Sequence, residues 1–228
     1  MTRSVLGTRR GAILHAAAAI LLALLFWLLG RYVTRHGEPP ALWQFARAVR
    51  GHAIWVAWAF TNAGWAQVLG PLYAICIAVA VRVRAWRARM LYLVTVALAA
   101  WGSADALQRL FARPRRLDWL IRHEHACSYP SSHAAISTAF YFLAALLIAR
   151  SELKAPVRYA SCTVLILMWL GILWSRLALA AHYPTDIAGG IALGLALALA
   201  GAAIAGLAGV RLGPQPSAKV FAGPGRGS

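Results

Sequence analysis

The run AILHAAAAILLALLFWLLG, residues 12–30, contains no Asp, Glu, Lys or Arg. A helix that crosses the hydrocarbon core of a bilayer needs about 20 predominantly apolar residues. The run therefore predicts a membrane-spanning helix. It is long for the apolar part of a secretory signal, and its small residues lie at its front instead of before a cleavage point. We therefore expect this helix to remain in the protein as its first span.

Five more apolar runs follow, at residues 65–81, 90–111, 132–149, 157–178 and 184–210. They predict an all-α integral membrane protein with six transmembrane helices, formed by a single domain of residues 1–210. Residues 31–62 mix aromatic and basic residues, which is typical of an amphipathic helix in the membrane interface. Alternatively, residues 53–60 lengthen the second span. Residues 211–228 are rich in Gly, Pro and Ser, and we predict a disordered cytoplasmic tail.

The composition is both apolar and basic. Hydrophobic residues make up 61% of the chain and charged residues 13%, yet 23 Lys and Arg against 6 Asp and Glu leave a net charge of +17. This balance excludes a disordered chain, a disulfide framework and a coiled coil. A soluble nucleic-acid binder needs an aqueous basic surface, which a chain of apolar spans does not offer. We therefore expect no nucleic acid among its partners.

The distribution of the basic residues predicts the orientation. Six spans place both termini on one side, and with cytoplasmic termini 13 of the 23 basic residues lie inside, as the positive-inside rule requires. Of the ten that remain outside, six lie close to polar motifs. We therefore predict an N-in, C-in protein, with those motifs on the outer face of the membrane.

Three polar groups stand at the ends of the spans. Ionisable residues are costly near a membrane, so their presence there points to function. One group closes the third span, one opens the fourth, and one joins the fifth and sixth. Their members are Gln108, Arg109, Arg113, Arg115 and Arg116 in the first; Pro130, Ser131, Ser132 and His133 in the second; and Ser175, Arg176, His182 and Asp186 in the third.

These residue types favour phosphate chemistry. Arginines, serine hydroxyls and the amides at a helix start bind phosphate oxygens. Two histidines and an aspartate supply a nucleophile or base, an acid and an orienting group. His182 and Asp186 are spaced i, i+4, so a helix start would place them on one face. The acidic residues form no cluster suited to Mg²⁺, and we predict neither metal nor cofactor.

Other polar residues have simpler interpretations. The run at residues 123–125, His-Glu-His, lacks the spacing of a zinc helix, and we interpret it as a polar loop. Asp105 lies four residues before Arg109, which predicts an ion pair within one helix. Gly190 and Gly194 predict close packing of the sixth span against another helix.

The pattern Ser175-Arg176-x5-His182-x3-Asp186, together with Pro130-Ser131-x-His133, resembles the type 2 phosphatidic acid phosphatase superfamily over residues 90–190. The family's third motif is matched in full. In the second motif, Pro-Ser-Gly-His, Ser132 replaces Gly. In the first, Lys-x6-Arg-Pro, Arg115 matches the Arg, whereas Gln108 replaces Lys and Arg116 replaces Pro.

The resemblance implies a role for each matching residue. His182 attacks phosphorus to form a phosphohistidine while Asp186 binds its other nitrogen, and His133 protonates the leaving oxygen and then activates water. The phosphate oxygens are held by Arg115, Arg176, Ser131 and the amide of Ser132. Gln108 donates a hydrogen bond without the charge of the family's Lys, and Arg109 or Arg113 is a candidate to supply that charge.

The expected activity is hydrolysis of a lipid-linked phosphate or diphosphate. By resemblance to small bacterial members, undecaprenyl diphosphate is the first choice, with phosphatidylglycerophosphate, phosphatidic acid and lipid A phosphate as alternatives. The same resemblance implies a bacterial inner membrane, with the active site facing the periplasm. A rival hypothesis is a non-enzymatic lipid-phosphate binder or transporter on the same scaffold, which the altered first motif favours and the intact histidines oppose. The expected partners are the lipid substrate and the surrounding membrane lipids, and the sequence predicts no particular oligomeric state.

Overall fold

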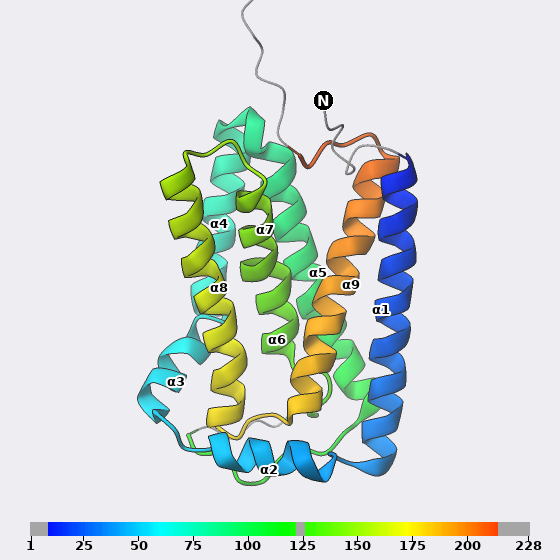
Figure 1. Cartoon of the computed structure of the whole chain (residues 1–228), viewed down its shortest axis with the longest axis vertical. Coiled ribbons are helices and arrows are strands. Elements are labelled where there is room, and N and C mark those ends of the chain that lie inside the picture. Colours follow the sequence, from blue (N-terminus) through cyan, green and yellow to red (C-terminus); the bar gives the residue numbers. More distant parts are fainter. Residues whose placement is uncertain (1–8, 122–125, 214–228) are drawn as a thin grey trace, which may run out of the picture.

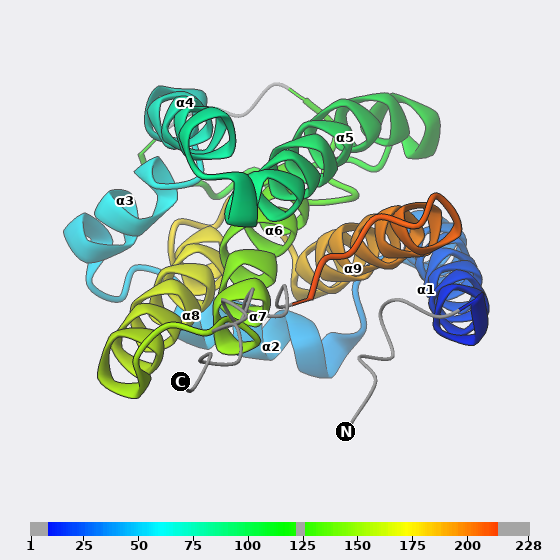
Figure 2. The same ribbon diagram turned by 90° about the horizontal axis from the view of Figure 1, so that it is seen from above.

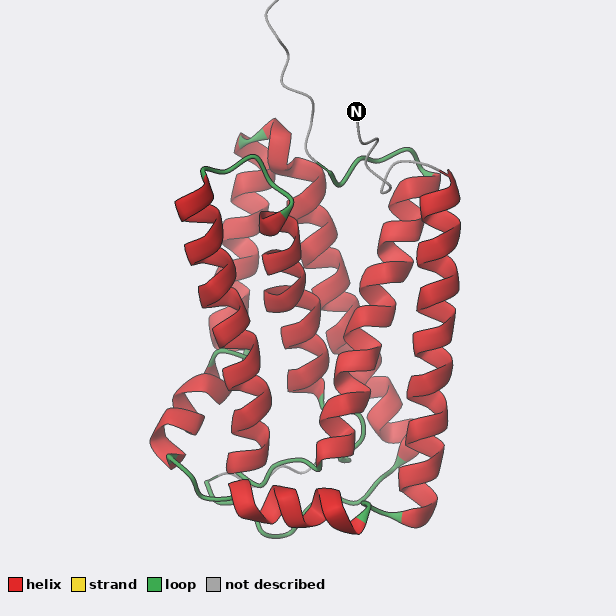
Figure 3. Ribbon diagram, viewed as in Figure 1, coloured by secondary structure: helices red, strands yellow, loops and turns green. Residues whose placement is uncertain are grey.

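The computed structural model describes residues 9–121 and 126–213. Within these ranges the chain forms helices and their connections, and it contains no strand (Figure 3). Five helices are long and apolar enough to cross a membrane, and there are six if α3 and α4, bent by 41°, form one broken span. This confirms the predicted all-α membrane fold. The helices are α1 Arg9–His36, α2 Pro40–Val49, α3 Ile54–Asn62, α4 Ala66–Arg82, α5 Arg87–Phe111, α6 Ser132–Ser137, α7 Leu143–Ala149, α8 Ala155–Ala178 and α9 Pro184–Leu207.

The helices extend beyond some of the predicted spans. The first span was expected at residues 12–30, but α1 continues to His36 because arginine is a good helix former. It ends where Gly37 adopts a φ of +76° and donates its N–H to the Val33 carbonyl. The fourth span is α6 and α7, joined without a break by a π-helical turn at Thr138–Phe142.

Residues 31–62 contain the helices α2 and α3. Both the predicted interfacial helix and the predicted lengthening of the second span apply to part of this segment. Helix α2 lies across one end of the bundle, as expected of an interfacial helix (Figure 1). Helix α3 leads into α4, as the alternative proposed. Viewed along the bundle, α2 extends beneath both α8 and α9 (Figure 2).

Close packing of α9 is a central feature of the bundle. A Cβ atom on Gly190 would lie 2.5 Å from the Ser131 carbonyl oxygen, and one on Gly194 would lie 2.7 Å from the Ala135 oxygen. This confirms the predicted close approach, and α6 is the helix that α9 meets. On its other side α9 packs along α1. The backbone that carries the second motif is thereby held directly against α9.

The two ends of the bundle differ. The start of α1 and the end of α9 lie at one end, together with the α4–α5 and α7–α8 connections (Figure 1). Helix α2, the α5–α6 connection and the α8–α9 connection lie at the other. All three polar motifs therefore meet at one end, and the arginine-rich α4–α5 connection lies at the opposite end, as the predicted topology requires.

Candidate active site

The second and third motifs are joined through the backbone. Ser131 is the N-cap of α6, where its Oγ accepts the Ala134 N–H at 3.4 Å. The Ser131 N–H in turn donates to the Asp186 carbonyl oxygen at 3.0 Å. The cap thus holds the side chain of Ser131, which was expected to bind phosphate, and the contact with the first turn of α9 holds its backbone.

His182 and Asp186 meet at the start of α9, but not on a shared helical face. His182 precedes α9, because the N-cap of this helix is Tyr183, whose backbone is extended, and the helix begins at Pro184. Asp186 turns back, and its Oδ2 accepts the Tyr183 N–H at 2.9 Å. The same oxygen lies 3.4 Å from His182 Nδ1. The predicted pairing is present, and N-terminal capping of the helix brings it about.

Asp186 has two further donors. Arg113 Nη1 lies 2.5 Å from Oδ1, and the Ser128 hydroxyl donates to Oδ2. Asp186 and His182 are both fully buried. Arg113 was a candidate to supply charge to a substrate phosphate, whereas the structure places it on Asp186.

Arg115 approaches the other nitrogen of His182. Its Nη1 lies 3.1 Å from Nε2 and donates to the Ala181 carbonyl oxygen at 2.9 Å. A guanidinium only donates, so this contact favours an unprotonated Nε2, with the ring proton on Nδ1 facing Asp186. Burial, and then the charge of Arg115, lower the pKa of His182 to about 4. The imidazole is therefore neutral near pH 7, as a nucleophile must be.

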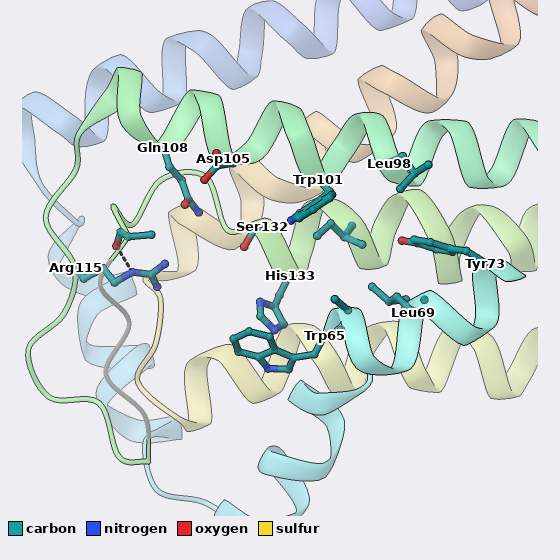
Figure 4. A pocket seen from close by; sticks show the side chains of 15 residues that line it. Trp65, Leu69, Tyr73, Leu98, Trp101, Asp105, Gln108, Arg115, Ser132 and His133 are labelled. Carbon is teal, nitrogen blue, oxygen red and sulfur yellow. Dashed lines mark hydrogen bonds between the residues drawn. The ribbon is translucent and has the colours of Figure 1, made fainter.

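A cavity of about 500 Å³ opens beside Arg115, between α4, α5 and α6. Its polar end presents Asp105, Gln108, Arg115, Ser132 and His133, and its other end is apolar (Figure 4). The His133 ring meets the Trp65 indole edge to face, with 5.3 Å between the centroids. The apolar part is lined by Leu69, Tyr73, Leu98, Trp101 and Ile136.

The cavity does not collect every predicted residue. Arg176 is buried outside the lining, where its Nη1 donates to Thr61 Oγ1 at 2.6 Å. Arg109 forms the predicted pair with Asp105 at 2.5 Å; its side chain is 78% exposed and does not line the cavity. Gln108 lines the cavity and also donates to the Pro130 carbonyl oxygen at 2.8 Å.

Three residues that contact the predicted site residues were not identified from the sequence: Ser128 contacts Asp186, Thr61 contacts Arg176, and Glu38 contacts Arg113. Ser128 and Thr61 are common polar residues that carried no signal. Glu38 was detectable in principle, because it is one of only six acidic residues in the chain. Within residues 9–121 and 126–213, no three His, Cys, Asp or Glu side chains are arranged to hold a metal ion. The predicted polar loop at residues 123–125 lies outside the described residues, as does most of the predicted tail.

Known proteins are similar to this chain in sequence and in fold. A family model described as the PAP2 superfamily matches residues 88–208. The crystal structure of a transmembrane PAP2-type phosphatidylglycerolphosphate phosphatase from Bacillus subtilis superposes with a TM-score of 0.63 at 22% identity, covering 78% of this chain and 91% of that chain. No curated protein matches the chain. The chain therefore belongs to the PAP2 superfamily.

Proposed function

We propose that this protein hydrolyses a lipid-linked phosphate or diphosphate through a phosphohistidine on His182, without a metal ion. One observation carries the proposal: a buried His182 contacts Asp186 through Nδ1 and Arg115 through Nε2, and Arg115 borders the cavity that contains His133. A lipid-phosphate binder needs neither a nucleophile nor an oriented imidazole, so this arrangement favours the enzyme over the rival hypothesis.

The reaction has two displacements. His182 Nε2 attacks the terminal phosphorus, and the bond from that phosphorus to the leaving oxygen breaks. His133 gives the leaving oxygen a proton, and this oxygen belongs to the lipid alcohol in a monophosphate and to the lipid monophosphate in a diphosphate. A water molecule then gives its proton to His133 and attacks phosphorus, and the P–N bond breaks to release phosphate. Between the two displacements, Asp186 stabilises the positively charged imidazole of the phosphohistidine at His182. A phosphate oxygen takes over the Arg115 hydrogen bond, which leaves Nε2 free to react.

Positive charge around the phosphate replaces a metal in this proposal. Phosphoryl transfer depends mainly on positioning and on neutralising the equatorial oxygens. Arg115 lines the cavity, Arg176 lies close enough to affect the pKa of His182, and the Ser132 amide and Gln108 are candidate donors at the same end. Arg109 and Arg113 are left out of the phosphate clamp in this proposal, because each is already paired with a carboxylate.

The substrate combines an anionic head with an apolar tail, which matches the polar and apolar ends of the cavity. Undecaprenyl diphosphate is our first choice, from the resemblance to small bacterial members that recycle this carrier. Phosphatidylglycerophosphate follows, because the similar solved structure is named for it. Phosphatidic acid and lipid A phosphate complete the set, with the site facing the periplasm of a bacterial inner membrane.

Phosphate release from these four lipids by the purified protein in excess EDTA tests the proposal. We expect release from at least one of them, and its loss in His182→Ala and in His133→Ala. His52→Ala is the matched control, since His52 is exposed at the same end of the bundle. Chemical quenching should trap a phosphoenzyme that is stable in alkali and labile in acid, and His182→Ala should not form it.

Three outcomes would contradict the proposal. Near-wild-type turnover in His182→Ala would exclude the phosphohistidine. Loss of activity in EDTA that Mg²⁺ restores would exclude the metal-free mechanism. Release from none of the lipids would favour the binder.

A further inference from the structure

Glu38, between α1 and α2, is a buried carboxylate that lies outside the family match of residues 88–208. Its side chain is 4% exposed. Oε2 accepts from Arg113 Nη2 at 2.9 Å and from the Thr185 hydroxyl, and Oε1 accepts the Thr185 N–H at 3.2 Å. Burying a carboxylate is costly unless it is paired and hydrogen-bonded, and here both conditions are met.

Arg113 joins this carboxylate to the proposed nucleophile. Its Nη2 binds Glu38, while its Nη1 binds Asp186 at 2.5 Å and the Thr185 hydroxyl at 2.8 Å. Asp186 in turn contacts His182 Nδ1 at 3.4 Å. A continuous series of contacts therefore runs from the α1–α2 connection to the imidazole.

Without Glu38, the charges of Arg113 and Asp186 would cancel. Arg113 and Asp186 alone would form a neutral pair, and the field of Asp186 at His182 would be largely offset by the guanidinium. Two further cations, Arg115 and Arg176, already act on His182 and oppose a positive imidazole. With Glu38 present, the group of two carboxylates and Arg113 carries one net negative charge.

We propose that Glu38 is a positioning residue that neutralises Arg113, so that Asp186 keeps its negative charge available to His182. This inference rests on the proposed reaction at His182. The imidazole becomes positive when Nε2 bonds to phosphorus, and the net negative group stabilises that form most when the positive charge develops. Glu38 acts through Arg113 and Asp186, and it does not line the substrate cavity.

Glu38→Gln removes the charge and keeps the shape. We expect kcat to fall roughly 10- to 100-fold, the equivalent of losing one charged hydrogen bond, with KM for the lipid unchanged. The matched control is Asp118→Asn, which removes a carboxylate paired with Arg116 at 2.8 Å at the same end of the bundle. It should leave kcat and KM near their wild-type values.

A second measurement is independent of turnover. Titration of labelled histidine by NMR, with the His182 signal identified by its absence in His182→Ala, reports the pKa of the imidazole. The charged groups that act on His182 are Arg115, Arg176 and Asp186. Loss of negative charge behind Asp186 should lower the pKa of His182 in Glu38→Gln, whereas Asp118→Asn should leave it unchanged.

The double variant Glu38→Gln with Arg113→Gln separates a charge role from a structural one. It removes both charges of the buried pair, so that Asp186 keeps the one net negative charge beside His182, and it can be measured even if Glu38→Gln alone fails to fold. If Glu38 acts by neutralising Arg113, the pKa of His182 in the double variant should be near the wild-type value. Where Glu38→Gln folds, the double variant should also have a higher kcat than Glu38→Gln alone. A purely structural role predicts an unchanged pKa in the single variant and a lower kcat in the double.

The two proposals can fail separately. If the wild type hydrolyses no lipid phosphate, the proposed function fails and the titration still tests Glu38. If Glu38→Gln leaves both the pKa of His182 and kcat unchanged while phosphate release depends on His182, the inference about Glu38 is overturned and the function stands.

Discussion

Gln108 shows how one side chain serves both the site and the scaffold. It stands where the family has Lys, and it faces the cavity. Its Nε2 also donates to the Pro130 carbonyl oxygen, directly before the N-cap of α6. The amide therefore ties the end of α5 to the start of the second motif, a role that the spacing of the first motif does not reveal.

Gln108→Lys should preserve or raise kcat/KM for the lipid substrate. A lysine ammonium can donate to the same carbonyl and adds positive charge near Arg115, where the phosphate is proposed to bind. Gln108→Met is the matched control; it leaves the buried carbonyl without this donor and should lower stability by about 1–3 kcal/mol. Phosphate-release kinetics and thermal unfolding measure the two effects. A severe loss of activity in Gln108→Lys would mean that the clamp is arranged differently.

At the scale of elements, the approach of α9 to α6 positions the site. The contact is between backbones, because Gly190 faces the Ser131 carbonyl and Gly194 faces the Ala135 carbonyl. Ser131 also donates its N–H to the Asp186 carbonyl oxygen. Any increase in the separation of these helices would therefore move the two catalytic motifs relative to each other.

Gly190→Ala should destabilise the protein by roughly 1–3 kcal/mol, because its methyl group would lie 2.5 Å from the Ser131 oxygen and a backbone carbonyl cannot move aside cheaply. Phosphate release should fall as well. Gly102→Ala in α5 is the matched control, since a Cβ there meets nothing within 4 Å and should stabilise the helix by up to about 1 kcal/mol. Thermal unfolding in detergent compares them, and equal stability of both variants would contradict the packing argument.

At the scale of the whole molecule, the bundle has two ends with different tasks. The motif end carries Asp186, His182 and their buried partners, and α2 crosses it (Figure 1). The opposite end carries Arg82, Arg84 and Arg87 in and around the α4–α5 connection. Basic residues are enriched on the cytoplasmic side of membrane proteins, so this end is proposed to face the cytoplasm.

Cysteine labelling in intact cells tests this orientation. In a background with Cys76, Cys127 and Cys162 replaced by Ala, a membrane-impermeant maleimide should label Leu117→Cys, which lies at the motif end and is 85% exposed as Leu. Val210→Cys, beyond the end of α9, should react only after the membrane is permeabilised. The reverse pattern would place the active site in the cytoplasm.

The sequence by itself determined the features that depend on neighbours along the chain. Apolar runs predicted the spans, because crossing a bilayer depends on the local hydropathy of about 20 residues. The spacing of four residues predicted the Asp105–Arg109 pair, because helical geometry brings such residues together. Order and spacing also predicted His133, His182 and Asp186 as site residues, since their motifs are short segments.

Only the tertiary structure decided which partner each charged residue meets. Arg113 and Arg115 are two residues apart and alike in sequence, yet Arg113 binds Asp186, 73 residues away, whereas Arg115 reaches His182 and the cavity. Glu38 binds Thr185 across 147 residues. The physical reason is that a charge becomes stable in a buried site only with a specific partner, and the packing of distant helices selects that partner.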